Sequence, residues 1–225
     1  MAVDECLLYR YGAAGDTVLR LYGWSRPCIT IGYFQGVREE VNLERCEHSQ
    51  VDVVRRITGG GAVFHDMEVT YSLVTKRFHS DIMASYRSIC DMVVLGLGHM
   101  GLDASFSPLN DVTVNGKKVC GNAQTRKGGA LLQHGTILLD VDVEKMFSLL
   151  NVPTAKIRDK AIAGVKERVA GIGRTFEQTV DALKRGAQDA FGCGLDTMSL
   201  SGKDIAECRR IMAARYSQRS WTHKR

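Results

Sequence analysis

The chain has 225 residues, of which 44% are hydrophobic and 24% are charged, and its formal net charge is +5. This is the composition of an ordinary globular protein of about one domain. No run of about 18 apolar residues occurs, which excludes a membrane-spanning helix, and the N-terminal MAVDECLLYR lacks the basic region of a secretory signal. We therefore expect a cytoplasmic protein with no membrane partner.

The predicted elements alternate between helices and strands without a regular βαβ repeat. Apolar spacing of three and four residues predicts helices, and alternation or β-branched runs predict strands. The predicted helices cover 2–10, 37–50, 81–101, 143–150, 176–191 and 202–217. The predicted strands cover 17–24, 28–35, 51–57, 68–77, 111–124 as a hairpin around Asn115-Gly116, and 130–142. This order favours an α+β fold with a mixed or largely antiparallel sheet flanked by helices.

The positive charge and the cysteines have distinctive distributions. Residues 201–225 hold seven Lys or Arg against Asp204 and Glu207, a balance of +5, whereas the other 200 residues are neutral overall. A solvated helix face is the simpler interpretation, and a docking surface for an acidic partner or nucleic acid is the alternative. The seven cysteines are scattered singly, which indicates reduced, mostly buried thiols and no zinc or disulfide framework.

The segment RRITGGGAVFHD (55–66) places three glycines between two arginines and a short strand. Glycines allow backbone N–H groups to line a concavity that suits phosphate or carboxylate oxygens, and an arginine can bind a phosphate in bidentate fashion. A tight turn beside two surface arginines is the alternative. The pattern matches neither the dinucleotide-binding nor the P-loop motif.

Two further segments carry ionisable residues beside turns. NGKKVCG (115–121) places Lys117 and Lys118 on opposite faces of a returning strand, so one of them can enter a cleft. His134 interrupts an apolar strand, where a hydrogen-bonded core histidine is the more common outcome. Asp111 follows Asn110 just before the hairpin. A turn cap is the simplest interpretation of this pair, and the alternatives are that it holds a metal ion or orients an incoming amine.

Taken together, these segments resemble one family. RRITGGGAVFHD, NDVTVNGKKVCGNAQ (110–124) and QHGTILLDVD (133–142), in this order, are similar to the signature blocks of lipoate–protein ligases and their octanoyltransferase relatives. KIRDKAIAGVKERV (156–169) resembles a further ligase segment, and the likeness runs from Met1 to about Trp221. Biotin–protein ligases share the fold, but their glycine loop is basic, unlike GGGAVF.

The resemblance implies an ATP-dependent ligase. Such an enzyme joins lipoate and ATP, with Mg²⁺, into lipoyl-AMP and then acylates a lysine on a lipoyl domain of a 2-oxoacid dehydrogenase E2 or a glycine-cleavage H protein. It implies that Lys118 is the catalytic cation that stabilises the transition state. It places His134 and Gly121 at the acyl pocket and allows Asp111 a role in placing Mg²⁺ or the acceptor lysine. The residues implied to bind the nucleotide or acyl-adenylate are Arg56, Gly59, Gly60, Gly61, Ala62, Val63, Phe64 and Asp111.

Both ends depart from the family pattern. Many members carry a strand before the first helix, and long ligases continue beyond the point resembled by YSQRSWTHKR into an accessory domain needed for adenylation. We therefore expect one catalytic domain over residues 1–225, acting as a ligase with a separate accessory subunit. The alternatives are a ligase acting alone, an ATP-independent transferase that takes octanoyl or lipoyl groups from acyl-carrier protein, and a non-catalytic binding module. No nucleic-acid partner is expected for the enzymes.

The cysteines bear on this choice. Octanoyltransferases of the superfamily use a nucleophilic cysteine, which one subfamily carries in a longer loop before the lysine hairpin. Here that loop is SFSPLN (105–110), without a cysteine. Cys120 is interpreted as a packing residue, with a nucleophilic role as the alternative. The short connection favours the ligase.

Overall fold

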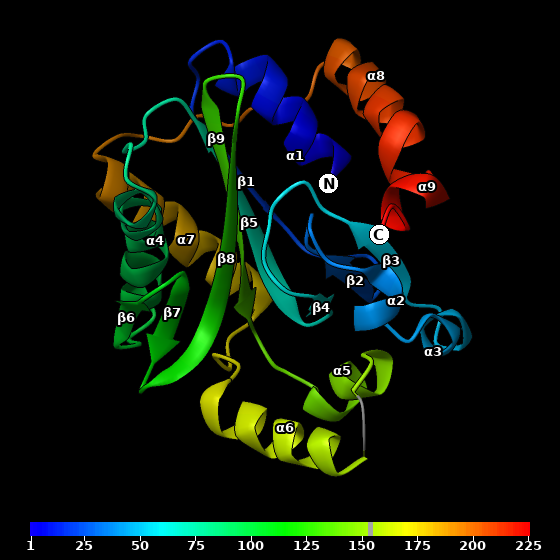
Figure 1. The fold of residues 1–225 in the computed structure, drawn as a ribbon. Helices are drawn as coiled ribbons and strands as arrows, with labels where there is room; N and C mark the ends of the chain where they lie inside the picture. The colour runs from blue at the N-terminus through cyan, green and yellow to red at the C-terminus, as the bar shows by residue number, and fades with distance from the viewer. Residues whose placement is uncertain (153–154) are drawn as a thin grey trace.

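The computed structural model describes residues 1–152 and 155–225, and within these ranges the fold is built on two β-sheets (Figure 1). The larger sheet has the strand order β1-β5-β9-β8-β7-β6, with every neighbouring pair antiparallel. Its strands are β1 (Val18–Tyr22), β5 (Glu68–Thr75), β6 (Ala104–Ser107), β7 (Asp111–Val114), β8 (Lys117–Lys127) and β9 (Ala130–Leu138). The smaller sheet has the order β3-β2-β4, from β2 (Cys28–Ile31), β3 (Asp52–Arg55) and β4 (Val63–His65). Because β2 pairs parallel with β3 and antiparallel with β4, the predicted mixed α+β fold is confirmed.

Two long helices cover one face of the larger sheet. α4 (Ile82–His99) and α7 (Phe176–Phe191) lie side by side there, and Figure 1 shows the smaller sheet on the opposite side. Both helices begin at a side-chain cap, because Asp81 accepts the N–H of Ala84 and Thr175 forms a capping box with Gln178. The main hydrophobic core fills the space between these helices and the sheet.

The smaller sheet carries its own core and its own helices. α2 (Val37–Glu40), α3 (Leu43–His48) and α5 (Val143–Leu149) contribute apolar side chains to this second cluster. α6 (Ala155–Arg168) follows α5 and contacts both α5 and β8. We did not predict this helix from the sequence, because half of residues 156–169 are charged and the segment shows only a weak apolar face.

The two ends of the chain pack together. α1 (Ala2–Leu7), which continues into the π-helical turn η1 (Leu8–Gly12), contacts α8 (Gly202–Ile211). η2 (Met212–Tyr216) and α9 (Arg219–Thr222) complete this C-terminal region. Part of its positive charge is used within the chain, because Arg215 pairs with Glu5 and Arg210 pairs with Glu207. None of the described helices combines the length and apolarity that crossing a bilayer requires.

Candidate active site

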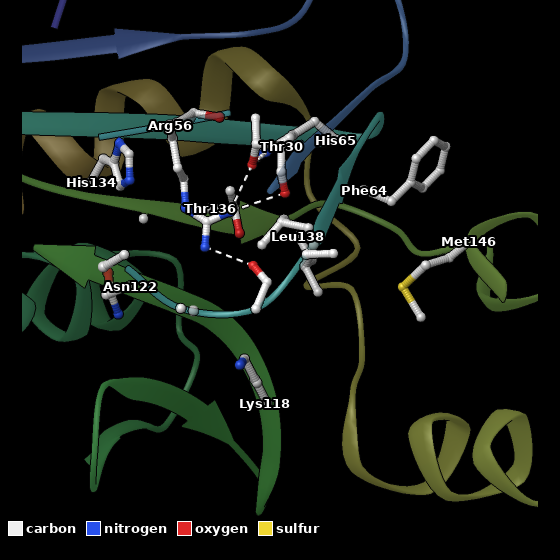
Figure 2. Close-up of a pocket in the computed structure, with 18 of the residues that line it drawn as sticks. Thr30, Arg56, Phe64, His65, Lys118, Asn122, His134, Thr136, Leu138 and Met146 are labelled. Carbon is white, nitrogen blue, oxygen red and sulfur yellow. Dashed lines mark hydrogen bonds between the residues drawn. The ribbon is translucent and has the colours of Figure 1, made fainter. Parts of the chain in front are cut away.

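A cavity of about 350 Å³ lies between the two sheets. Its walls come from the glycine loop, β4, β8 and β9. Apolar side chains at Leu138, Val141, Met146, Val165 and Val169 also line it. In Figure 2, Met146 and Leu138 lie toward one side of the pocket, and His134 and Asn122 lie toward the other. The pocket therefore combines an apolar region, suited to a hydrocarbon chain, with a polar region.

Arg56 holds the glycine loop from inside. Arg56 is 4% exposed, and its Nη2 donates to the carbonyl oxygens of Gly59 at 2.8 Å and Gly61 at 2.6 Å. Nη1 donates to both the backbone oxygen and the hydroxyl oxygen of Thr30, at 3.0 and 3.1 Å. Burial lowers the pKa of Arg56 to about 10. Because four acceptors already surround its terminal nitrogens, Arg56 shapes the loop, a role that the sequence did not predict.

The structure requires glycine to different degrees at Gly59, Gly60 and Gly61. Gly60 has φ of +90°, a conformation that side chains rarely adopt, and a Cβ there would lie 3.0 Å from Nη2 of Arg56. A Cβ on Gly59 or Gly61 would meet nothing within 4 Å. The backbone therefore requires glycine only at Gly60, and Gly61 keeps the pocket wall open.

Arg55 points away from the pocket and serves the fold. It is fully buried, and its guanidinium donates to five backbone carbonyls at 2.6 to 3.1 Å. The acceptors are Gly32, Tyr33, Gln35, Trp221 and Thr222. Arg55 thereby ties the loop after β2 to α9.

Behind the loop lies a buried hydrogen-bonded network. His65 Nδ1 lies 2.8 Å from Glu68 Oε1, and His65 Nε2 lies 2.8 Å from the hydroxyl of Thr30. The Trp24 indole N–H donates to Glu68 Oε1 at 2.9 Å and to Thr70 Oγ1 at 2.8 Å. The Trp24 ring stacks on His65 with 4.2 Å between centroids. His65 is thus fixed on three sides.

Lys118 reaches the pocket from β8. Its Nζ lies 2.7 Å from Asp111 Oδ1 on the neighbouring strand β7, which pairs with β8 across a bulge. The backbone of the chain after α6 runs alongside, because Ala170 donates its N–H to the Lys118 carbonyl at 3.0 Å. A Cβ at Gly121 would lie 3.0 Å from both Cε and Nζ of Lys118. Gly121 therefore leaves the space that the Lys118 side chain occupies.

His134 lies in a polar corner of the pocket. Its Nε2 is 2.8 Å from the hydroxyl of Thr58, and its Nδ1 is 3.9 Å from Asp4 Oδ2. Burial lowers the pKa of His134, and the nearby Asp4 carboxylate opposes this shift without overcoming it. His134 is therefore neutral near pH 7.

Cys120 lies in the main hydrophobic core. It is fully buried, and burial raises the pKa of its thiol well above the usual range. Its side chain faces the core beneath the sheet, near Asn122 Oδ1 at 3.5 Å. Among residues 1–152 and 155–225, no cysteine lines the pocket. This burial agrees with the interpretation of Cys120 as a packing residue.

The structure gathers the residues singled out from the sequence around one cavity. The pocket-lining members are Arg56, Gly60, Gly61, Ala62, Val63, Phe64, Lys118, Gly121 and His134. Gly59 and Asp111 lie just behind the wall, bonded to Arg56 and Lys118. Sequence reasoning missed Thr30, Asn122 and Trp24, which also line the pocket. Thr30 alone carried a signal, as the one polar residue in the apolar strand CITI.

Comparison with known proteins places this site in a family. The model for the lipoyl protein ligase A/B catalytic domain matches residues 1–192. The octanoyltransferase LipM of Halalkalibacterium halodurans is 34% identical, with 100% of this chain and 94% of the relative covered. LipM of Bacillus subtilis is 32% identical, with 100% and 93% covered. The solved structure of a bi-partite lipoate protein ligase from Thermoplasma acidophilum superposes with a TM-score of 0.93 and 31% identity, covering 99% of this chain and 89% of that one.

These relatives correct the expected reaction. The LipM relatives that match across the whole chain are octanoyltransferases and not ligases, so the expected ATP-dependent ligase with ATP and Mg²⁺ as cofactors is wrong. In this structure Arg56 is hydrogen-bonded within the glycine loop, and Asp111, the residue considered for Mg²⁺, is paired with Lys118. The family model covers most of the chain, and the chain belongs to the lipoyl protein ligase A/B catalytic domain family.

Proposed function

We propose that this protein transfers an octanoyl group from a carrier-protein thioester to the side-chain amine of a lysine on a lipoyl domain, without ATP. The observation that carries the proposal is the pairing of LipM relatives across the whole chain with a pocket that joins an apolar region to Lys118. Each methylene buried in such a pocket contributes about 0.8 kcal/mol, so an eight-carbon chain gains several kcal/mol.

The reaction needs little from the protein beyond placement and charge. The acceptor lysine nitrogen attacks the thioester carbonyl carbon, a C–N bond forms, and the C–S bond breaks. The amine loses a proton, and the departing thiolate takes one up, so the products are an amide and a free thiol. Negative charge grows on the carbonyl oxygen in the transition state, and we assign its stabilisation to the ammonium of Lys118.

The acyl group passes directly from donor to acceptor in this proposal. The supporting observation is that no cysteine in the described residues lines the pocket, and that Cys120 is enclosed by the core. A covalent thioester on the enzyme therefore has no thiol on which to form. Because the donor arrives already activated, the proposal requires neither adenylation nor an accessory ligase subunit.

The test mixes the protein with an octanoylated acyl-carrier protein and an apo lipoyl domain, with no ATP present. The expected result is an octanoylated acceptor lysine, detected by intact mass, at a rate that ATP and Mg²⁺ leave unchanged. Modification that uses free octanoate or lipoate and appears only with Mg-ATP would contradict the proposal.

A second arm tests direct transfer. The protein is incubated with the octanoyl donor alone, denatured in acid and weighed by mass spectrometry. We expect no octanoylated enzyme. An adduct that hydroxylamine removes, mapped to any cysteine, would show instead that transfer proceeds through an enzyme thioester.

A further inference from the structure

Four buried side chains form a continuous line of hydrogen bonds from β5 to the glycine loop. We call Glu68, His65, Thr30 and Arg56 the relay. All four are at most 4% exposed, and they come from β5, β4, β2 and the segment after β3. Figure 2 shows Arg56 between Thr30 and the loop, with His65 beside Thr30.

The direction of each bond in the relay follows from chemistry. A carboxylate only accepts hydrogen bonds, so the Nδ1 of His65 carries the proton donated to Glu68 Oε1. Nε2 of His65 lies 2.8 Å from the Thr30 oxygen and accepts the hydroxyl proton, because that oxygen already receives a hydrogen bond from Arg56, which can only donate. The Thr30 hydroxyl thus donates to His65, and a lone pair of its oxygen accepts the hydrogen bond from Nη1 of Arg56.

The relay ends on two peptide groups of the loop. Nη2 of Arg56 donates hydrogen bonds to the carbonyl oxygens of Gly59 and Gly61, so both oxygens point toward Arg56. Both peptides are trans, and in a trans peptide the N–H points opposite to the C=O. The N–H groups of Gly60 and Ala62 therefore point away from Arg56. Within the described residues neither N–H has a hydrogen-bond partner, and both residues line the pocket.

We propose that the relay is a positioning device that aims the Gly60 and Ala62 N–H groups at the carbonyl oxygen of the acyl group, so that they form an oxyanion site together with Lys118. This inference rests on the proposed acyl transfer. Two backbone donors held in advance stabilise the charge that develops on the carbonyl oxygen, and they cost no reorganisation during the reaction. Thr30 is the decisive member, because its hydroxyl alone connects His65 to Arg56.

The first experiment compares two substitutions at Thr30. Thr30→Val keeps the shape of the side chain and removes the hydroxyl, whereas Thr30→Ser keeps the hydroxyl. We expect Thr30→Val to lower kcat about 10- to 100-fold with the donor KM within about twofold, since the donors act only in the transition state. Thr30→Ser should stay within about threefold of the wild type.

Thr75→Val is the matched control. Thr75 is equally buried on β5 and its hydroxyl bonds to Thr17 at 2.8 Å, away from the pocket. It should lower thermal stability by a similar amount and leave kcat unchanged. The proposal is overturned if Thr30→Val keeps a kcat within twofold of the wild type, or if Thr30→Ser loses as much activity as Thr30→Val.

A second measurement stands even if Thr30→Val fails to fold or the wild type shows no transfer. Wild-type protein labelled with ¹⁵N-glycine and ¹⁵N-alanine is titrated with a trifluoromethyl ketone carrying an eight-carbon chain, whose hydrate resembles the tetrahedral intermediate. The Gly60 and Ala62 amide protons should shift downfield. Chemical-shift changes at Gly61 and Gly121 would show that the ketone has bound. If these occur while the Gly60 and Ala62 amide protons do not shift, the relay proposal is overturned. An inactive wild type with shifted amides would instead contradict only the proposed transfer reaction.

Discussion

The Nζ of Lys118 lies 2.7 Å from Oδ1 of Asp111, on adjacent strands, and this ion pair fixes a cation at the pocket wall. Fixing matters because a preorganised charge stabilises a transition state without having to be moved into place. We expect Lys118→Met to lower kcat at least about 100-fold. Steady-state transfer assays would check this, with circular dichroism to confirm folding.

Lys117 provides the control for Lys118. It is the preceding residue on the same strand and is exposed. Lys117→Met removes the same charge from the opposite face, so transfer should be unchanged. Equal losses in the two variants would mean that net charge, and not the position of Lys118, controls the rate.

A methyl group at Gly121 should disturb the same cation. The added Cβ would lie 3.0 Å from the end of the Lys118 side chain, so the ammonium must move by a few tenths of an ångström. A displaced charge loses part of its effect, and we expect Gly121→Ala to lower kcat about tenfold with little change in melting temperature. Gly98→Ala, at an exposed helix position with open space around it, should leave kcat intact and stabilise the fold slightly. Normal turnover in Gly121→Ala would show that Lys118 tolerates the shift.

Cys120→Ser separates a packing cysteine from a nucleophile. The new hydroxyl would be buried in an apolar cluster, which costs about 1–3 kcal/mol of unfolding free energy. Transfer by the folded protein should remain within a few-fold of the wild type, as measured below the unfolding transition. Cys193→Ser, at an exposed position, should change neither property. A folded Cys120→Ser protein that has lost transfer would assign Cys120 a chemical role.

Neutral His134 should make stability depend on pH. Its pKa in the folded protein is lowered from 6.5, so the unfolded chain takes up a proton at a higher pH than the folded chain does. The contribution of His134 to stability is therefore complete above about pH 7 and is lost as the pH falls below 6.5. Urea unfolding at pH 8 and pH 5 would measure this change.

His134→Gln should flatten that pH dependence, because the glutamine amide does not titrate. His48→Gln is the control, since His48 is exposed on α3. It should keep the wild-type difference between the two pH values. If His134→Gln keeps the whole difference too, other groups titrate in this range.

Much of the fold follows from local patterns. The spacing of apolar residues in 81–101 located α4, and alternation in 68–77 located β5, because each buries one regular face. Asn115-Gly116 located the β7–β8 hairpin through the positive φ of both residues. α6 was missed because half of its residues are charged and its apolar face is weak.

The site was only partly predictable. The motifs bring Arg56, Lys118 and His134 to one cavity, but the sequence could not show what Arg56 binds, since its partner Thr30 lies 26 residues away on another strand. Glu68 lies only three residues from His65, yet its bond depends on the turn between β4 and β5. The motifs also could not separate ligase from transferase, because an adenylate and a thioester both need a cation beside the acyl carbonyl.

The carbonyl contacts of Arg55 make the pocket wall depend on a distant part of the chain. Two of its acceptors, Trp221 and Thr222, lie 166 and 167 residues further along the chain. A buried guanidinium without these partners is strongly unfavourable, so the strand that leads into the glycine loop is stable only when α9 is in place. A change in α9 is therefore felt at the glycine loop, although none of the described residues of α9 lines the pocket.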